Sequence, residues 1–286
     1  MTPVPQPRIV LVDGVPMSAL VTTAPEPRGV IVAVHGGATM GAYFDCPGNP
    51  RLSLVRAAAA HGFTAIALDR PGYGSSALYA EEFDDPDRRV SFAYGAVDTI
   101  LGNTARGAGV FLMGHSAGCE LALRMSVERD VVGIELAGTG LRYHADARAV
   151  IKQATLTTRP GLRDLLWQPT SLYPQEVLTS VLSAPGVAYE MEVTTQWARR
   201  DLPELAARVT APVQFSVADH EAVWDSTPEA IASIVALFSA APGVTVNEVA
   251  DAGHNISVGL SADEYHRRVL AFADECFARM GAEAGR

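Results

Sequence analysis

The sequence lacks several features that mark particular classes of protein. It contains a single lysine, Lys152, so a mechanism through a lysine Schiff base has little support. Its three cysteines, Cys46, Cys119 and Cys276, are widely separated and form no CxxC pair, which argues against a zinc site and fits a reducing compartment. The sequence has neither a glycine-rich loop with a phosphate-binding lysine nor a G-x-G-x-x-G motif, and we expect no metal and no cofactor.

Signals for export and for membrane insertion are also missing from the sequence. The first residues, MTPVPQPR, have no basic start and no apolar stretch of roughly 7 to 15 residues, as a secretory signal would. The longest apolar run, residues 230–241, is shorter than the ~20 residues that a membrane helix needs. We therefore expect a cytoplasmic protein with no membrane partner.

Net charge and amino-acid composition further narrow the class of protein to which the sequence can belong. Hydrophobic residues make up 48% of the 286 residues and charged residues only 19%, so enough apolar surface is available to stabilise a fold. The net charge is -10, and such a field repels phosphate backbones, so nucleic acid is not an expected partner. A cluster of charges at residues 84–89 (DDPDRR) is expected to form a solvated loop, which could equally gate a substrate pocket.

Short apolar runs alternate with segments of helical pattern along most of the chain. Two β-rich runs, 8–12 and 17–22, flank the turn signal Asp13-Gly14 and predict a hairpin. Strands buried on both faces are predicted at residues 29–34, 64–68, 110–113, 131–136, 213–217 and 244–249. Such strands between helices predict an α/β fold, with helices on both faces of a mostly parallel sheet.

The interval from residue 139 to residue 205 breaks this alternation, because it shows helical and turn signals but no buried strand. We interpret it as a helical cap inserted after the sixth strand, with residues 1–138 and 206–286 forming the core. The cap carries Trp167, Tyr173 and Trp197, which are candidates for binding an apolar substrate. The alternative is that these aromatic side chains form the cap's own core.

The segment GHSAG at residues 114–118 has the pattern G-x-S-x-G. It lies between a predicted buried strand and an Ala- and Leu-rich helix, the context in which this motif places a serine on a sharp strand-to-helix turn. The flanking glycines are required because a side chain there would collide with a neighbouring strand or helix. The helix start directs free N–H groups toward negative charge that forms beside Ser116. Ser116 is therefore a candidate nucleophile.

Four motifs in order resemble the landmarks of the α/β-hydrolase fold family, over most of the chain. HGGA (35–38) follows the third strand, DRPGYGS (69–75) follows the fourth, GHSAG follows the fifth, and DAGH (251–254) follows the last. The resemblance implies an eight-stranded sheet. It also implies that Ser116 is the nucleophile and that His254 is the base, which a serine hydroxyl needs near neutral pH.

The identity of the third catalytic residue stays open between several acids. A carboxylate that orients the histidine is expected after the seventh strand, where Asp219 and Glu221 both occur. The family pattern G-x-x-D, with Ala218 in the place of the glycine, puts Glu221 at the acid, and Asp219 is the alternative. Glu135 in the sixth strand is a third candidate, which could equally make a structural hydrogen bond or ion pair.

The same resemblance implies an oxyanion hole formed by two backbone N–H groups. One belongs to Ala117, directly after the nucleophile, and the other to Gly37 in the HGGA loop. Because this loop is not the HGGG of one esterase branch, Ala38 could donate in place of Gly37.

Together these residues predict a serine hydrolase that cleaves an ester, thioester or lactone of a small to medium apolar acyl substrate, free or carrier-bound, through an acyl-enzyme on Ser116. A thioesterase or lactonase is the leading variant. The alternatives are a C–C bond hydrolase with the same triad and a member of the fold that binds a small molecule without turnover. An aspartate nucleophile is excluded because the turn at residues 114–118, which we call the elbow, carries Ser116. The oligomeric state stays open.

Overall fold

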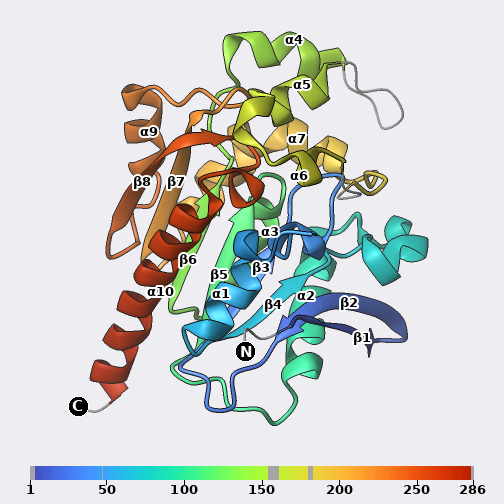
Figure 1. The fold of residues 1–286 in the computed structure, drawn as a ribbon, viewed down its shortest axis with the longest axis vertical. Coiled ribbons are helices and arrows are strands. Elements are labelled where there is room, and N and C mark those ends of the chain that lie inside the picture. Colours follow the sequence, from blue (N-terminus) through green and yellow to red (C-terminus); the bar gives the residue numbers. More distant parts are fainter. Residues whose placement is uncertain (1–3, 47, 154–160, 180–182, 285–286) are drawn as a thin grey trace.

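The computed structural model describes residues 4–46, 48–153, 161–179 and 183–284, which form one eight-stranded sheet with helices on both faces (Figure 1). The strand order is β1-β2-β4-β3-β5-β6-β7-β8. The two strands β1 and β2 pair antiparallel to their neighbours, and all other pairs are parallel. The predicted α/β class is confirmed. The strands are β1 (Gln6–Val12), β2 (Val15–Thr22), β3 (Val30–Val34), β4 (Thr64–Leu68), β5 (Val110–His115), β6 (Gly133–Ala137), β7 (Val213–His220) and β8 (Val244–Gly253).

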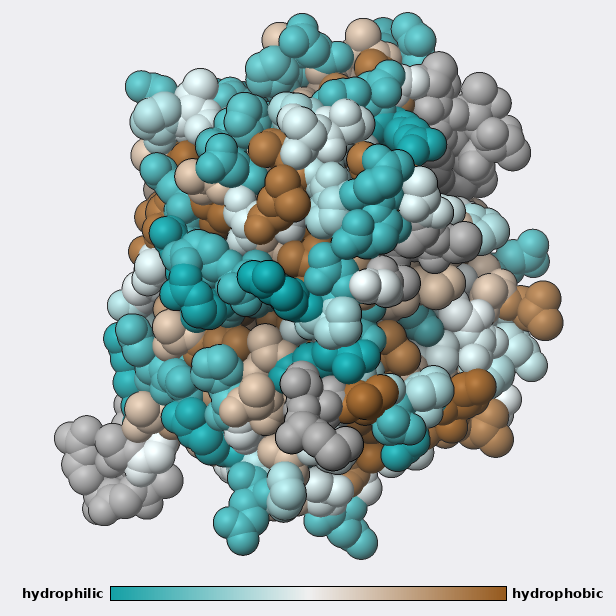
Figure 2. Space-filling view, in the orientation of Figure 1, coloured by the Kyte–Doolittle hydropathy of each residue, from teal (hydrophilic) through white to brown (hydrophobic). Residues whose placement is uncertain are grey.

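The exposure of the side chains distinguishes the inner strands of the sheet from its outer strand. All five residues of β3 and all five of β4 are buried, as expected for parallel strands covered on both faces. By contrast, β1 is the outer strand, and Ile9 and Leu11 on it are 67% and 66% exposed. Figure 2 shows apolar side chains over this hairpin. Its turn at Asp13 and Gly14 has positive φ at both residues, which suits the twist of a tight hairpin.

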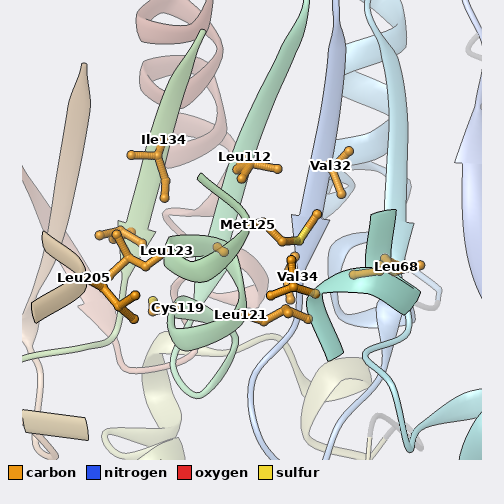
Figure 3. Packing of buried hydrophobic residues seen from close by; sticks show 14 of the residues in the cluster. Val32, Val34, Leu68, Leu112, Cys119, Leu121, Leu123, Met125, Ile134 and Leu205 are labelled. Atoms are coloured by element: carbon orange, nitrogen blue, oxygen red, sulfur yellow. The ribbon is translucent and has the colours of Figure 1, made fainter. Parts of the chain in front are cut away.

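The helices cover the sheet in two layers. One face packs against α1 (Leu54–Ala60) and α10 (Ala262–Ala284), and the other packs against α2 (Pro86–Leu101), α3 (Gly118–Glu128) and α9 (Pro228–Val235). In Figure 3, Leu121 and Met125 of α3 lie against Val34 and Leu112 of the central strands. This packing fixes the start of α3 directly beside the end of β5, where the predicted nucleophile lies. No helix within the described residues is both long and apolar enough to span a membrane.

The structure corrects the expectation for the charged cluster at residues 84–89. Helix α2 begins at Pro86, and the Asp85 side chain accepts a hydrogen bond from the Asp87 N–H at 3.0 Å, as an N-cap does. Arg89 is buried and forms an ion pair of 2.9 Å with Glu120 of α3. The cluster is thus a helix start with one buried cation, because Glu120 offers that cation a partner inside the protein.

Several short helices lie between β6 and β7, over the carboxyl ends of the strands (Figure 1). These helices lie in the interval interpreted above as an inserted cap, and we call them the cap. The last of them packs against α3, so the predicted boundary between residues 205 and 206 falls inside a helix that joins the core. The division into core and cap stays a prediction. The elements are α4 (Ala145–Gln153), α5 (Leu162–Trp167), α6 (Gln175–Thr179), α7 (Glu190–Gln196), the π-helical turn η5 (Trp197–Asp201) and α8 (Leu202–Ala206).

Candidate active site

Ser116 lies on the turn between β5 and α3 in a strained backbone conformation. Its φ is +52°, a region that residues other than glycine rarely adopt. The turn is held from both sides, because the Ser116 N–H donates to the Ala137 carbonyl at 2.8 Å and the Ser116 carbonyl accepts from the Cys119 N–H at 3.0 Å. Such strain persists only where the surroundings impose it, and here it presents the hydroxyl at the start of a helix.

The glycines that flank Ser116 allow a close approach of backbone to backbone. A Cβ atom on Gly118 would collide with the carbonyl oxygens of Val34 and His35 at the end of β3. A Cβ atom on Gly114 would lie 2.8 Å from the Cα atom of Cys119 in α3. The sequence-based reason for both glycines, collision with a strand or helix, is therefore confirmed at these two positions.

His254 follows the end of β8 and connects Ser116 to Glu221. Its Nε2 atom lies 3.1 Å from Ser116 Oγ, and its Nδ1 atom lies 2.9 Å and 3.0 Å from the two carboxylate oxygens of Glu221. The ring is buried, with 1% of the side chain exposed. The backbone carbonyl of His254 accepts a hydrogen bond from His115 Nε2 at 2.9 Å, so the elbow also positions the loop that carries the base.

Glu221 directly follows β7, and its side chain is only 5% exposed, so its carboxylate needs partners. The N–H groups of Val223 and Trp224 donate to its Oε1 atom at 2.7 Å and 3.4 Å, and His254 faces both oxygens. Burial alone would raise the pKa of Glu221, but His254 and these backbone donors lower the pKa below its ordinary value. Glu221 is therefore held as the carboxylate that a histidine base requires.

The two competing acids lie elsewhere. Asp219 is 44% exposed, and its oxygens accept hydrogen bonds from the N–H groups of Asp251 and Ala252 at 2.9 Å and 3.0 Å. Glu135 is buried inside the sheet and accepts a hydrogen bond from the Tyr265 hydroxyl at 3.0 Å. Neither carboxylate has a hydrogen bond to His254, so the geometry brings Glu221 alone of the three to the histidine.

Replacing Glu135 with glutamine is expected to weaken the pH dependence of stability. Burial raises the pKa of Glu135 to about 8, against about 4.3 in an unfolded chain. Between these values the folded protein keeps a proton that the unfolded chain releases, so the free energy of unfolding falls as pH rises, by at most about 1.4 kcal/mol per pH unit. Denaturant unfolding of wild type and Glu135→Gln at about pH 5 and about pH 8 measures this slope. Equal slopes in both proteins would contradict the assignment.

The loop after β3 presents one candidate donor for an oxyanion. The Ala38 N–H already donates to the Tyr73 hydroxyl at 3.0 Å. Within the part of the chain that the structure describes, the N–H groups of Gly37 and Ala117 have no hydrogen-bond acceptor. Both residues line the cavity beside Ser116. The geometry therefore favours Gly37 over Ala38 as the partner of Ala117.

A cavity of about 490 Å³ opens between this site and the cap. Its floor includes Ser116 and His254, and its upper wall is largely apolar. Trp167 and Trp197 line it, as the sequence suggested, and Trp197 is fixed because its ring N–H donates to the Thr139 hydroxyl at 2.7 Å. Lining side chains that the sequence analysis did not single out as site residues include the apolar or aromatic Tyr143, Ile151, Leu162, Leu166, Val193 and Trp224 and the polar or charged Arg163, Ser183, Glu190, Thr194 and Asn255.

Tyr173 does not line this cavity, contrary to the sequence-based expectation. Its ring is buried behind the loop that carries His254, and its hydroxyl accepts a hydrogen bond from the Asn255 N–H at 3.2 Å. The ring also packs edge-on against Trp167, with centroids 5.1 Å apart. The residue thus supports the loop after β8, because a tyrosine satisfies its hydroxyl and its apolar ring in one buried position.

The described residues contain no group of three or more His, Cys, Asp or Glu side chains placed to hold a metal ion. The side chains that meet at the cavity floor are instead a hydroxyl, an imidazole and a carboxylate in hydrogen-bond sequence. Such a chain can remove a proton from the hydroxyl and stabilise the imidazolium that results.

Comparisons with solved structures agree with this fold. Among solved structures, a soluble variant of monoglyceride lipase from Saccharomyces cerevisiae is 14% identical, with a TM-score of 0.72 and coverage of 96% of each chain. A monoacylglycerol lipase from Paleococcus ferrophilus is 22% identical, with a TM-score of 0.61, over 92% of this chain and 98% of the other. The thioesterase domain from the curacin biosynthetic pathway is 16% identical, with a TM-score of 0.61, over 93% and 99%. At these identities the likeness concerns the fold.

A search of curated proteins finds no significant match to the sequence. The sequence does match the alpha/beta hydrolase family over residues 31–269, which include the loop after β3, the elbow, Glu221 and His254. This match spans most of the chain and agrees with the sheet topology and the strained serine turn described above. The chain therefore belongs to the alpha/beta hydrolase family.

Proposed function

We propose that this protein is a serine hydrolase that cleaves an ester, thioester or lactone of a small to medium apolar acyl group through an acyl-enzyme on Ser116. The observation that carries the proposal is the hydrogen-bonded sequence Glu221, His254, Ser116 at the floor of an apolar cavity. Family membership supports hydrolase activity, and the choice of bond and substrate rests on the cavity and its donors.

The reaction follows from the positions of these groups. Ser116 Oγ attacks the carbonyl carbon while His254 Nε2 takes its proton, and Glu221 stabilises the imidazolium. The carbonyl oxygen becomes negative, and the N–H groups of Gly37 and Ala117 donate to it. Collapse of this intermediate breaks the bond to the leaving group, which takes the proton from His254. Water then attacks the acyl-enzyme with His254 as base, and this releases the acid and restores Ser116.

The oxyanion donors suit this task because they are backbone groups, fixed before charge develops. Removing one such donor typically costs about 3 kcal/mol of transition-state stabilisation. Gly37 is held by its neighbours, since the Gly36 carbonyl accepts from the Arg70 side chain at 3.0 Å and the Ala38 N–H is bound to Tyr73. The positive end of α3 adds to the stabilisation at Ala117.

Longer acyl chains are expected to be hydrolysed faster until the cavity is filled. Each methylene that leaves water for an apolar wall contributes about 0.8 kcal/mol, which is roughly a fourfold gain in kcat/KM. Steady-state rates with p-nitrophenyl esters from acetate to laurate measure the trend, and the matching thioesters and lactones identify the preferred bond. A rate that is highest for acetate and falls with every added methylene would contradict the proposed apolar acyl site.

A further inference from the structure

Three buried side chains join the cap to the loop that carries Gly37. Arg70 and Tyr73 lie in the turn after β4, and Glu190 is the first residue of α7 in the cap. Arg70 Nη2 and the Tyr73 hydroxyl both donate to the Oε1 atom of Glu190, the hydroxyl at 2.6 Å. The Arg70 and Glu190 side chains are 1% and 7% exposed. We call Arg70, Tyr73 and Glu190 the cap cluster.

The two donors of the cap cluster also hold the peptide groups on either side of Gly37. Arg70 Nη2 donates to the Gly36 carbonyl at 3.0 Å, and the Ala38 N–H donates to the Tyr73 hydroxyl at 3.0 Å. A Cβ atom on Gly37 would lie 3.3 Å from each carboxylate oxygen of Glu190. The carboxylate therefore sits against Gly37. Its two partners fix the orientation of the Gly37 N–H together with His35 Nδ1, which donates to the same Gly36 carbonyl at 2.8 Å.

The charges of the cap cluster make this arrangement compatible with an oxyanion nearby. Burial alone would lower the pKa of Arg70, but Tyr189, Glu190 and Tyr73 more than offset this effect and raise the pKa, so the guanidinium stays charged. Burial raises the pKa of Tyr73, so its hydroxyl keeps the proton that it donates. A cationic Arg70 neutralises a carboxylate that would otherwise repel negative charge on the substrate.

We propose that Glu190 is a positioning residue through which the cap holds the Gly37 N–H in the geometry that stabilises the oxyanion. Because Glu190 also lines the cavity, the position of α7 over the substrate and the orientation of the Gly37 N–H are linked through this side chain. This inference rests on the proposed function, and it assigns part of the transition-state stabilisation to a cap residue that touches neither the nucleophile nor the base.

The test compares Glu190→Ala with wild type and with Glu192→Ala as a matched control. Glu192 is an acid of the same helix α7, but it is exposed, and its Oε1 atom accepts a hydrogen bond from Arg200 Nη2 at 3.4 Å. Glu190→Ala is expected to lower kcat by about 10- to 100-fold, less than the full loss of an oxyanion donor. Glu192→Ala is expected to retain kcat, because this side chain lies on the exposed face of α7.

Two inhibitors separate positioning from general loosening of the cap. A trifluoromethyl ketone with the acyl chain of the best ester forms an oxyanion on Ser116, and its affinity should fall by the same factor as kcat/KM in Glu190→Ala. An ether analogue of that ester has no carbonyl, and its affinity should stay near the wild-type value. Equal losses for both inhibitors would overturn the inference, because they would show a purely structural role in the cavity wall.

Two further variants test the proposal if Glu190→Ala does not fold. Tyr73→Phe removes only the hydroxyl that holds Ala38 and should reproduce the loss of kcat. Glu190→Gln keeps an oxygen for both donors and should retain most of the activity. If wild type hydrolyses the ester and kcat is unchanged in Tyr73→Phe and Glu190→Ala, the positioning role alone is refuted. An inactive wild type would refute the proposed function itself.

Discussion

Replacing Ser116 with alanine is expected to lower kcat for the best p-nitrophenyl ester by roughly 10⁴- to 10⁶-fold. The substitution removes the atom that forms the acyl-enzyme, and leaves the cavity and the oxyanion donors in place. The hydroxyl contacts His254 and is not part of the core, so the fold should be retained. Steady-state kinetics measures the loss, and a thermal melt checks the fold.

His254→Ala is the companion to this experiment. Because the base and the nucleophile act as one unit, its kcat should fall about as far as that of Ser116→Ala, and the double variant should fall no further. Losses that multiply in the double variant would show that Ser116 and His254 act independently. A Ser116→Ala protein within about tenfold of wild type would show that hydrolysis proceeds through another group.

Replacing Glu221 with glutamine is expected to lower kcat by on the order of 10³- to 10⁴-fold with little change in KM. The glutamine has the shape of the native side chain, but it cannot stabilise an imidazolium, and its amide group can leave His254 in the wrong tautomer. The backbone donors of Val223 and Trp224 keep the loop in place, so the change acts on the histidine.

Asp219→Asn is the matched control, since this acid lies two residues before Glu221, at the end of β7. An asparagine oxygen can still accept a hydrogen bond from the Asp251 or Ala252 N–H, so kcat should fall by less than about fivefold. The opposite order, with Asp219→Asn severely impaired and Glu221→Gln near wild type, would assign the acid to Asp219 and contradict the geometry.

The elbow, the loop after β3 and His254 could be predicted from the sequence because each is a local pattern tied to the end of a buried strand. Parallel strands bring their carboxyl ends to one edge of the sheet, so residues that follow β3, β5, β7 and β8 converge there. The strand order was not predicted, since the apolar runs alone do not say which strands are neighbours.

The choice between Asp219 and Glu221 could not be made from spacing. The pairing of β7 with β8 shifts register between Ala218 and His220. This irregularity turns Asp219 toward the backbone of β8 and leaves Glu221 facing His254. A shift of one residue reverses which side chain points to a given face, and the sequence carries no clear sign of that shift.

The cap cluster and the burial of Arg89 were also beyond the sequence. Glu190 and Arg70 are 120 residues apart, and Arg89 and Glu120 are 31 apart, so no local pattern links either pair. A charged residue in a polar stretch is most often solvated. Only the structure shows that these residues have buried partners of opposite charge. The sequence-level trace of the cap cluster is the DRPGYGS turn, which supplies both donors to Glu190.

The central claim is that Ser116 is a nucleophile activated by His254 and Glu221, and the mass of the intact protein after treatment with a fluorophosphonate tests it most directly. Wild type is expected to gain one adduct, which is absent in Ser116→Ala and forms much more slowly in His254→Ala and Glu221→Ala. A folded wild type that gains no adduct, or an adduct of equal yield in Ser116→Ala, would contradict the claim.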